Sequence, residues 1–191
     1  MKPFRRRRRG GILATFEPGE AQVLSSLAGQ VVELLRDRGG THESDADPLA
    51  AQLGLGGPTQ PPEDPVLQRL LPDAYRDDAD DAAEFRKFTE RSLTSTKAAN
   101  AEILIGTLVD SGFDPDDDSD RPIEVELDPE QVQAWLRSLT DVRLALAVRL
   151  GIETDEDALD VHASDDEATA AMADVYDWLG YVQESLVLAL E

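Results

Sequence analysis

Residues 128–150, DPEQVQAWLRSLTDVRLALAVRL, decide the fold of this 191-residue chain. Asp128 suits the N-cap of a helix, the proline after it suits the first helical position, and Gln131 stands where a capping box needs it. Apolar residues then recur at the three- and four-residue spacing of an amphipathic helix. They are Val132, Trp135, Leu136, Leu139, Val142, Leu146 and Leu150. A helix of this length must bury its apolar stripe against other helices, so this segment predicts a helical core.

Similar signals lie on both sides of this segment. Residues 79–111 and 168–190 predict two more long helices, and shorter helices start near residues 17 and 64. Within residues 79–111 the apolar contacts are assigned to Phe85, Phe88, Leu93, Ile103, Leu104 and Leu108. Residues 12–16 and 123–127 have the pattern of short strands, which allows a small two-stranded β-ribbon. We therefore predict a mainly α fold, a compact multi-helix domain with about five helices, three of them long.

The predicted domain has a basic extension at one end. Residues 1–10 hold six basic residues and are expected to form a flexible basic arm. Residues 11–191 are expected to form a single helical domain. Glycine, proline, serine, aspartate and threonine dominate near residues 40–63, which predicts a loop-rich insertion there.

Composition excludes several classes of function. The chain has no cysteine, which excludes disulfides, thiolate metal sites and thiol catalysis. His42 and His162 are its two histidines, and the acidic run at residues 114–120 lacks the glycine and glutamate of an EF-hand loop. No nucleotide-binding or Gly-x-Ser-x-Gly motif occurs. We therefore expect no enzyme, no bound metal and no cofactor.

The sequence also indicates where the protein resides. No apolar run reaches the roughly 18 residues that a membrane span needs. The basic N-terminus is not followed by the apolar region of a signal peptide. We expect a cytoplasmic protein that makes no membrane contact.

Charge is distributed very unevenly along the chain. Forty acidic residues against 18 basic ones give a formal net charge of −22. Residues 10–191 hold 12 of the basic residues and all 40 acidic ones, a net charge of −28. Such a body repels a phosphate backbone, so DNA contact is expected to be weak and mediated by the arm. The candidate residues for it are Arg5, Arg6, Arg7, Arg8 and Arg9, and the alternative is a solvated tail.

Three polar residues in the predicted helices are further candidates: Lys97, Asn100 and Arg143. One interpretation is a pocket or binding surface. The favoured alternative is ion pairing between helices, with Arg143 partly buried against a carboxylate, because an unpaired buried charge is costly. The candidate carboxylates are Glu84, Glu102 and Glu184.

Aromatic residues cluster in the last predicted helix. Tyr176, Trp178 and Tyr181 fall within six residues, although aromatics make up only 5% of the chain. At helical angles Trp178 and Tyr181 share a face. That face is either part of the core or a docking surface, since tryptophan and tyrosine are enriched in interface hot spots.

Several segments, taken in order, resemble a known family. They are FRRR (4–7), LATFEP (13–18), DPVLQRLLPDAY (64–75), EFR (84–86), LDPE (127–130), AWL (134–136), DVRLAL (141–146), RLGI (149–152) and VYDWLG (175–180). Together they resemble the AosR-like oxidative-stress transcriptional regulators of actinobacteria, earlier described as a domain of unknown function. The resemblance covers nearly the whole chain and implies regulation rather than catalysis. A member that senses oxidants through thiols would need cysteines, so the resemblance does not extend thiol sensing to this chain.

These observations predict a non-enzymatic regulator of transcription that acts mainly through protein partners, with RNA polymerase or a sigma factor as the expected partner. Two alternatives stay open. Genes of the similar family commonly lie beside a Clp protease adaptor, which implies an adaptor linked to Clp-type proteolysis. A pocket near Lys97, Asn100 and Arg143 would instead indicate a small-molecule sensor or enzyme. An apolar helix face left exposed would allow a homodimer.

Overall fold

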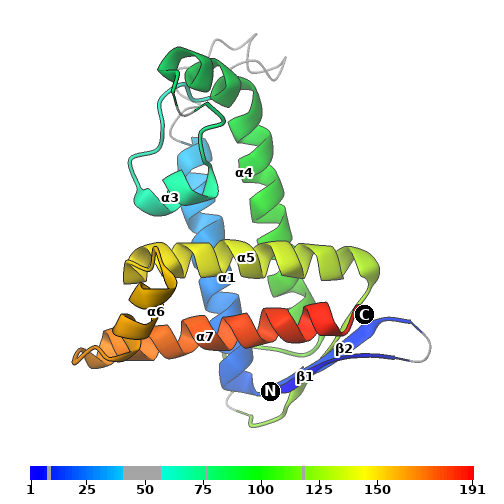
Figure 1. The fold of residues 1–191 in the computed structure, drawn as a ribbon. Helices are drawn as coiled ribbons and strands as arrows, with labels where there is room; N and C mark the ends of the chain where they lie inside the picture. The colour runs from blue at the N-terminus through cyan, green and yellow to red at the C-terminus, as the bar shows by residue number, and fades with distance from the viewer. Residues whose placement is uncertain (8–9, 41–56, 76, 118) are drawn as a thin grey trace.

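Two antiparallel helix pairs cross each other in this protein (Figure 1). The computed structural model describes residues 1–7, 10–40, 57–75, 77–117 and 119–191. Its helices are α1 (Pro18–Gly40), α3 (Pro65–Leu70), α4 (Ala79–Asp110), α5 (Pro129–Leu150), α6 (Asp155–His162) and α7 (Glu167–Leu188). One pair is α1 with α4 and the other is α5 with α7, while α3 packs on α5 and α6 packs on α7. The prediction of a mainly α fold is confirmed.

The helix α5 forms as its sequence predicts. The Asp128 side chain accepts hydrogen bonds from the backbone N–H groups of Glu130 and Gln131, and the Gln131 side chain accepts one from the Asp128 N–H. At the other end Gly151 adopts a left-handed conformation, with φ of 70°, which glycine adopts without a steric penalty. These caps fix where α5 begins and ends, and therefore which residues form its buried stripe.

The core lies where the two helix pairs cross and extends onto a small sheet. Trp135 of α5 and Leu179 of α7 are fully buried, as expected. The Trp135 indole N–H donates to the Thr107 hydroxyl of α4 at 2.8 Å, so its one polar group is satisfied in the interior. Trp135 thereby links α5 to α4.

The sheet is larger than the predicted ribbon. Its strands are β1 (Lys2–Arg6), β2 (Ile12–Phe16) and β3 (Ile123–Leu127), antiparallel in the order β1-β2-β3. The predicted pairing of residues 12–16 with 123–127 is present, with Ala14 opposite Val125. The strand β1 is the addition to the expected ribbon.

The prediction of a flexible arm over residues 1–10 is wrong for Lys2–Arg6. Phe4 is buried, with its ring centroid 5.9 Å from that of Phe16 and 5.8 Å from that of Trp135. The buried ring of Phe4 thus anchors this segment in the core. The arginines beside Phe4 in the sequence had led us to expect a solvated tail. Of the insertion expected near residues 40–63, residues 41–56 lie outside the described part, and residues 57–63 contain neither helix nor strand.

Candidate interaction surfaces

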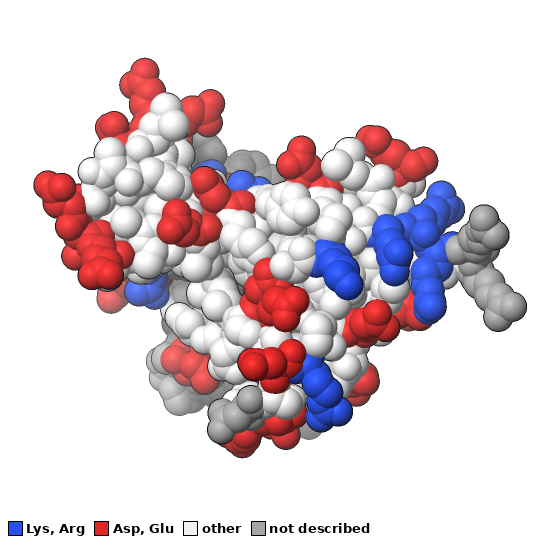
Figure 2. Space-filling view, turned by 90° about the horizontal axis from the view of Figure 1, so that it is seen from below, with Lys and Arg blue, Asp and Glu red and all other residues white. Residues whose placement is uncertain are grey.

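The basic residues of the N-terminus are carried by a hairpin rather than a free arm. The turn between β1 and β2 contains Gly10 and Gly11, with φ of 87° and 81°, a conformation that favours glycine. Arg5, Arg6 and Arg7 are exposed on this hairpin. Figure 2 shows basic side chains gathered at one end of the viewed face and acidic clusters over much of the rest. Of the five candidate arginines, Arg8 and Arg9 lie outside the described residues.

The sheet partly neutralises this positive patch. The Arg7 guanidinium lies 2.5 Å from a carboxylate oxygen of Glu126 on β3. The strand register also places Arg5 and Glu126 on either side of Leu13, on the same face of the sheet. The hairpin therefore exposes a small group of arginines, and the negative charge of Glu126 lies beside them. Such a surface can neutralise only a few phosphates.

Lys97 belongs to the contact between α4 and α5. The Lys97 ammonium lies 2.5 Å from a carboxylate oxygen of Asp141, and both side chains are largely buried. Burial raises the pKa of Asp141, while the hydrogen bond and the charge of Lys97 act in the opposite direction. Asn100 is buried on the same helix. The favoured interpretation, an ion pair between helices, holds for Lys97, although its partner is Asp141 rather than one of the expected glutamates.

Arg143 lies on another side of α5 and faces α7. Its guanidinium donates to the Gln183 side-chain oxygen at 3.0 Å and stands 5.1 Å from the centre of the Tyr176 ring. The expectation that Arg143 pairs with a carboxylate is therefore wrong among the described residues. An amide and an aromatic face take that place.

The three polar candidates do not surround one pocket in the described structure. Lys97 points to Asp141 between α4 and α5, whereas Arg143 points to α7. Positions 141 and 143 are about 200° apart around a helix, because each residue turns it by roughly 100°. The proposed pocket near Lys97, Asn100 and Arg143 thus loses its geometric basis.

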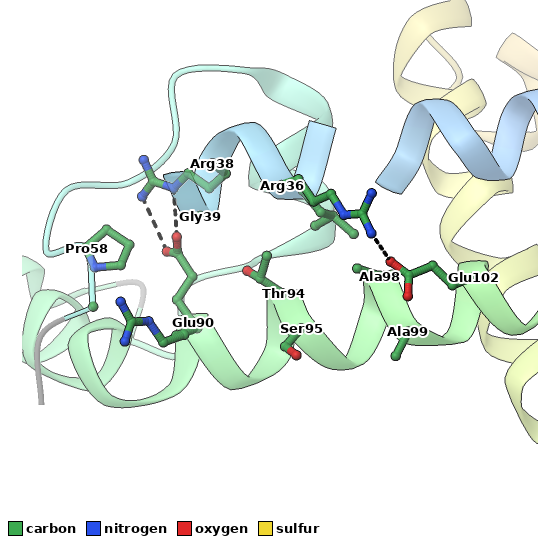
Figure 3. A pocket seen from close by; sticks show the side chains of 13 residues that line it. Arg36, Arg38, Gly39, Pro58, Glu90, Thr94, Ser95, Ala98, Ala99 and Glu102 are labelled. Carbon is green, nitrogen blue, oxygen red and sulfur yellow. Dashed lines mark hydrogen bonds and ion pairs between the residues drawn. The ribbon is translucent and has the colours of Figure 1, made fainter. Parts of the chain in front are cut away.

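A different cavity, of about 570 Å³, lies between α1 and α4 (Figure 3). Arg36 of α1 lies 2.6 Å from Glu102 of α4, and Arg38 lies 2.7 Å from Glu90. In Figure 3 these two ion pairs stand at opposite ends of the row of α4 residues that includes Thr94. Since both arginines are paired with carboxylates, neither presents an uncompensated charge to the cavity. The two ion pairs therefore form a structural bracket between α1 and α4.

The two aromatic candidates of α7 have different environments. Tyr181 is 46% exposed. Trp178 is half-buried, packs against the core and lines a cavity of about 300 Å³ with Val23 and Val175. Its indole N–H is buried and has no hydrogen-bond partner among the described residues. Only Tyr181 thus offers the outer surface that a docking role requires.

The outer face of α4 carries apolar side chains that the sequence reading assigned to apolar contacts. Phe85, Phe88, Leu93 and Ile103 expose 44%, 53%, 39% and 41% of their surface, whereas Leu104 and Leu108 are buried as expected. The buried face instead carries a series at four-residue spacing: Ala82, Arg86, Glu90, Thr94 and Ala98. That spacing was a readable signal, but two of its positions carry charged residues, Arg86 and Glu90, and such residues are typical of a solvent-facing helix surface.

Among the described residues, no group of three or more acidic or histidine side chains is placed to hold a metal ion. None of the described helices combines the length and the apolar character that crossing a membrane requires.

Comparison with known proteins gives a consistent family. The family model described as "Domain of unknown function (DUF2017)" matches residues 1–190. "Oxidative stress regulator AosR" of Mycobacterium tuberculosis (strain ATCC 25618 / H37Rv) is 34% identical over 191 residues, covering 93% of this chain and 81% of the relative. "Putative oxidative stress regulator AosR" of Mycobacterium leprae (strain TN) is 34% identical over 187 residues, covering 91% and 79%. No solved structure matches.

Proposed function

We propose that this chain, which belongs to the DUF2017 family and has relatives named as oxidative stress regulators, is a non-enzymatic regulator of transcription. It acts mainly by binding protein partners, with RNA polymerase or a sigma factor as the expected partner. The hairpin arginines make an auxiliary contact. The observation that carries this proposal is the charge distribution over the folded molecule.

A direct reader of duplex DNA neutralises phosphates with a broad set of lysines and arginines. Here the net charge is −22, and the hairpin holds a compact basic group, part of which is paired with Glu126. In the contact between α4 and α5, Lys97 also forms an ion pair with a carboxylate, that of Asp141. This distribution favours protein recognition over DNA recognition.

The absence of cysteine limits how oxidative stress could reach this protein. The chain has none, so it forms no disulfide and no sulfenic acid of its own. We propose that the stress signal arrives through the partner or through the amount of this protein. Regulation in response to oxidative stress would then not require a thiol on this chain.

A direct binding assay tests the proposal. The immobilised full chain is exposed separately to purified core RNA polymerase, to individual sigma factors and to a Clp chaperone. Saturable binding to polymerase or to a sigma factor, accompanied by a change in transcript yield in a reconstituted reaction, is the expected result. Binding to the Clp chaperone alone would replace the proposal with the proteolytic adaptor.

A further inference from the structure

An apolar stripe with no partner among the described residues runs along the outer face of α4. Its exposed members are Phe85, Phe88 and Leu93, and Thr89, Ser92 and Thr96 complete the row. These positions are spaced by three or four residues, so they form one continuous strip of helix surface. Contiguous exposed apolar surface of this kind, rimmed by polar residues, marks interaction sites.

The stripe forms one side of a groove rather than a flat surface. The segment from Leu71 to Ala74 lies beside it, and together they enclose a cavity of about 500 Å³. At one end the Tyr75 ring meets the Phe85 ring edge-on, with centroids 5.9 Å apart. The groove therefore has two walls and an aromatic end, which suits a rod-shaped occupant.

The floor of the groove is fixed by compensated charges. Arg86 is buried and pairs with Asp73, and its guanidinium also donates to the Thr59 carbonyl. Glu90 is buried beside it and pairs with Arg38 of α1. These pairs hold segment 71–74 and α1 onto α4. Because the charges of the floor are paired with one another inside the protein, the occupant is selected by the apolar stripe and by the rim.

The rim is strongly acidic at the start of α4. The exposed acids there are Asp77, Asp78, Asp80, Asp81 and Glu84. Asp81 and Glu84 lie one turn before Phe85 and Phe88 respectively. Farther along the helix the exposed residues include a base, Lys87, which lies 5.9 Å from the centre of the Phe88 ring, so the exposed acids named above gather at one end of the stripe. This asymmetry favours an occupant whose positive end faces the start of α4.

We infer that this α4 groove binds an amphipathic helix of a protein partner, with apolar side chains against the stripe and a lysine- or arginine-rich end over the acidic rim. From Phe85 to Thr96 the stripe is about 16 Å long, which matches about three turns of a partner helix. The inference rests on the proposed function and deepens it, since it gives the surface and the chemistry through which a partner is recognised.

A synthetic probe tests the groove without knowledge of the partner. The probe is a labelled helical peptide of about 14 residues, with leucines at positions spaced by three and four and lysines gathered at one end. The control peptide has the same composition with the leucines scattered, so it keeps the charge and loses the apolar face. Titration with the full chain at about 150 mM salt should give saturable binding of the probe and much weaker binding of the control peptide.

Matched variants locate the site. Phe88→Ser should weaken probe binding about tenfold or more, because an exposed aromatic anchor is lost. Val109→Ser is the control on the same helix, since Val109 is 51% exposed and Phe88 is 53% exposed. The pair Asp81→Asn and Glu84→Gln should reduce affinity and its salt dependence. Circular dichroism of each variant shows whether the fold is retained.

The outcomes separate this inference from the proposed function. Equal binding of both peptides, or equal loss in Phe88→Ser and Val109→Ser, overturns the groove. A dimer of the full chain that Phe88→Ser converts to a monomer assigns the groove to a second copy and also overturns the inference. If the probe binds as expected but polymerase and sigma factors do not, the groove stands and the proposed function fails. If polymerase binds wild type and Phe88→Ser equally, the groove fails and the proposed function stands.

Discussion

At the scale of single residues, the polar side chains between helices are held in place by specific partners. Lys97→Met should show this most clearly. The substitution strands the buried Asp141 carboxylate, and losing one partner of a buried pair costs about 3–5 kcal/mol. We expect a loss of this size in the free energy of unfolding at pH 7, measured by urea denaturation. The double variant Lys97→Met/Asp141→Leu should recover much of the loss.

The same substitution should make stability depend on pH. Burial raises the pKa of Asp141, and the hydrogen bond and charge of Lys97 oppose this rise. The substitution removes that opposing effect, so the pKa of Asp141 should rise further. An acid with a raised pKa in the folded state destabilises the protein when ionised, so its cost is greatest at high pH and falls as the carboxyl takes up a proton. The loss in Lys97→Met should therefore be smaller at about pH 5.5 than at pH 7. An equal loss at both pH values would contradict this account.

Arg143 should respond differently from Lys97. It faces Gln183 and Tyr176 rather than a carboxylate, and its Nε atom is buried without a hydrogen-bond partner among the described residues. Arg143→Met loses one hydrogen bond and one cation–π contact but also relieves the cost of burying a charge. We expect a change in unfolding free energy within about 1 kcal/mol. A loss of about 3 kcal/mol or more would indicate a buried ionic partner after all.

At the scale of secondary-structure elements, β1 should contribute to stability as well as charge. Phe4 is buried against Phe16 and Trp135. Phe4→Ala should therefore lower the free energy of unfolding by about 3–5 kcal/mol, the usual cost of removing a buried aromatic ring. Arg6→Ala, on the same strand but exposed, should change it by less than about 0.5 kcal/mol. Equal and small effects in urea denaturation would mean that the strand is not anchored by its phenylalanine.

The attachment of α6 should weaken as pH rises. No residue of α6 is buried, and the His162 ring lies 3.0 Å from the Asp177 carboxylate of α7. The Ala158 carbonyl, and then the charges of Asp177 and Asp174, raise the pKa of His162. Because the folded pKa is above the unfolded one, this attachment is fully present below about pH 6.5 and is lost as pH rises through the folded pKa.

Amide hydrogen exchange measures this effect. After correction for intrinsic rates, the α6 amides should exchange faster at about pH 8 than at about pH 6. His162→Gln should remove the difference between the two pH values. A pH difference that persists in this variant would place the titrating group elsewhere.

Capped helices were the most predictable elements. Residues 128–150 carry an N-cap, a proline and a regular apolar spacing, and α5 spans Pro129–Leu150. The hairpin was less predictable. A segment with five arginines and one phenylalanine looks solvent-exposed, and the contact of the Phe4 ring with Trp135, far along the chain, cannot be inferred from the local sequence. The α6 helix also lacks a buried stripe, and it forms through local capping by Thr154 and Asp157.

The surfaces were harder to predict than the helices. The sequence identified Lys97 and Arg143 as unusual, but their partners Asp141 and Gln183 lie on other helices and depend on how the pairs cross. Apolar residues of α4 are divided between core and surface by the positions of α1 and α5, which both pack on this helix. Burial of Arg86 and Glu90 could not be predicted without the ion pairs that satisfy them.

At the scale of the whole molecule, the acidic body and the small basic hairpin separate two modes of regulation. A protein-directed regulator binds polymerase without DNA, whereas a direct DNA reader does not need polymerase. Arg5→Gln, Arg6→Gln and Arg7→Gln together remove the described arginines of the hairpin and leave Phe4 in place. In this triple variant DNA affinity should fall, while affinity for the protein partner should change little. The salt dependence of DNA binding in the wild type should be shallow, since each phosphate contact contributes a slope of about −0.9.

The most direct measurement is a parallel titration of the labelled full chain, at about 150 mM salt, with RNA polymerase holoenzyme and with a pool of genomic duplex DNA fragments. We predict saturable binding to the holoenzyme that is at least about a hundredfold tighter than binding to any fragment. We also predict that the triple arginine variant retains the holoenzyme affinity. Tight binding to a specific DNA fragment that survives in the triple variant, with no measurable binding to polymerase or to a sigma factor, would contradict the proposed function.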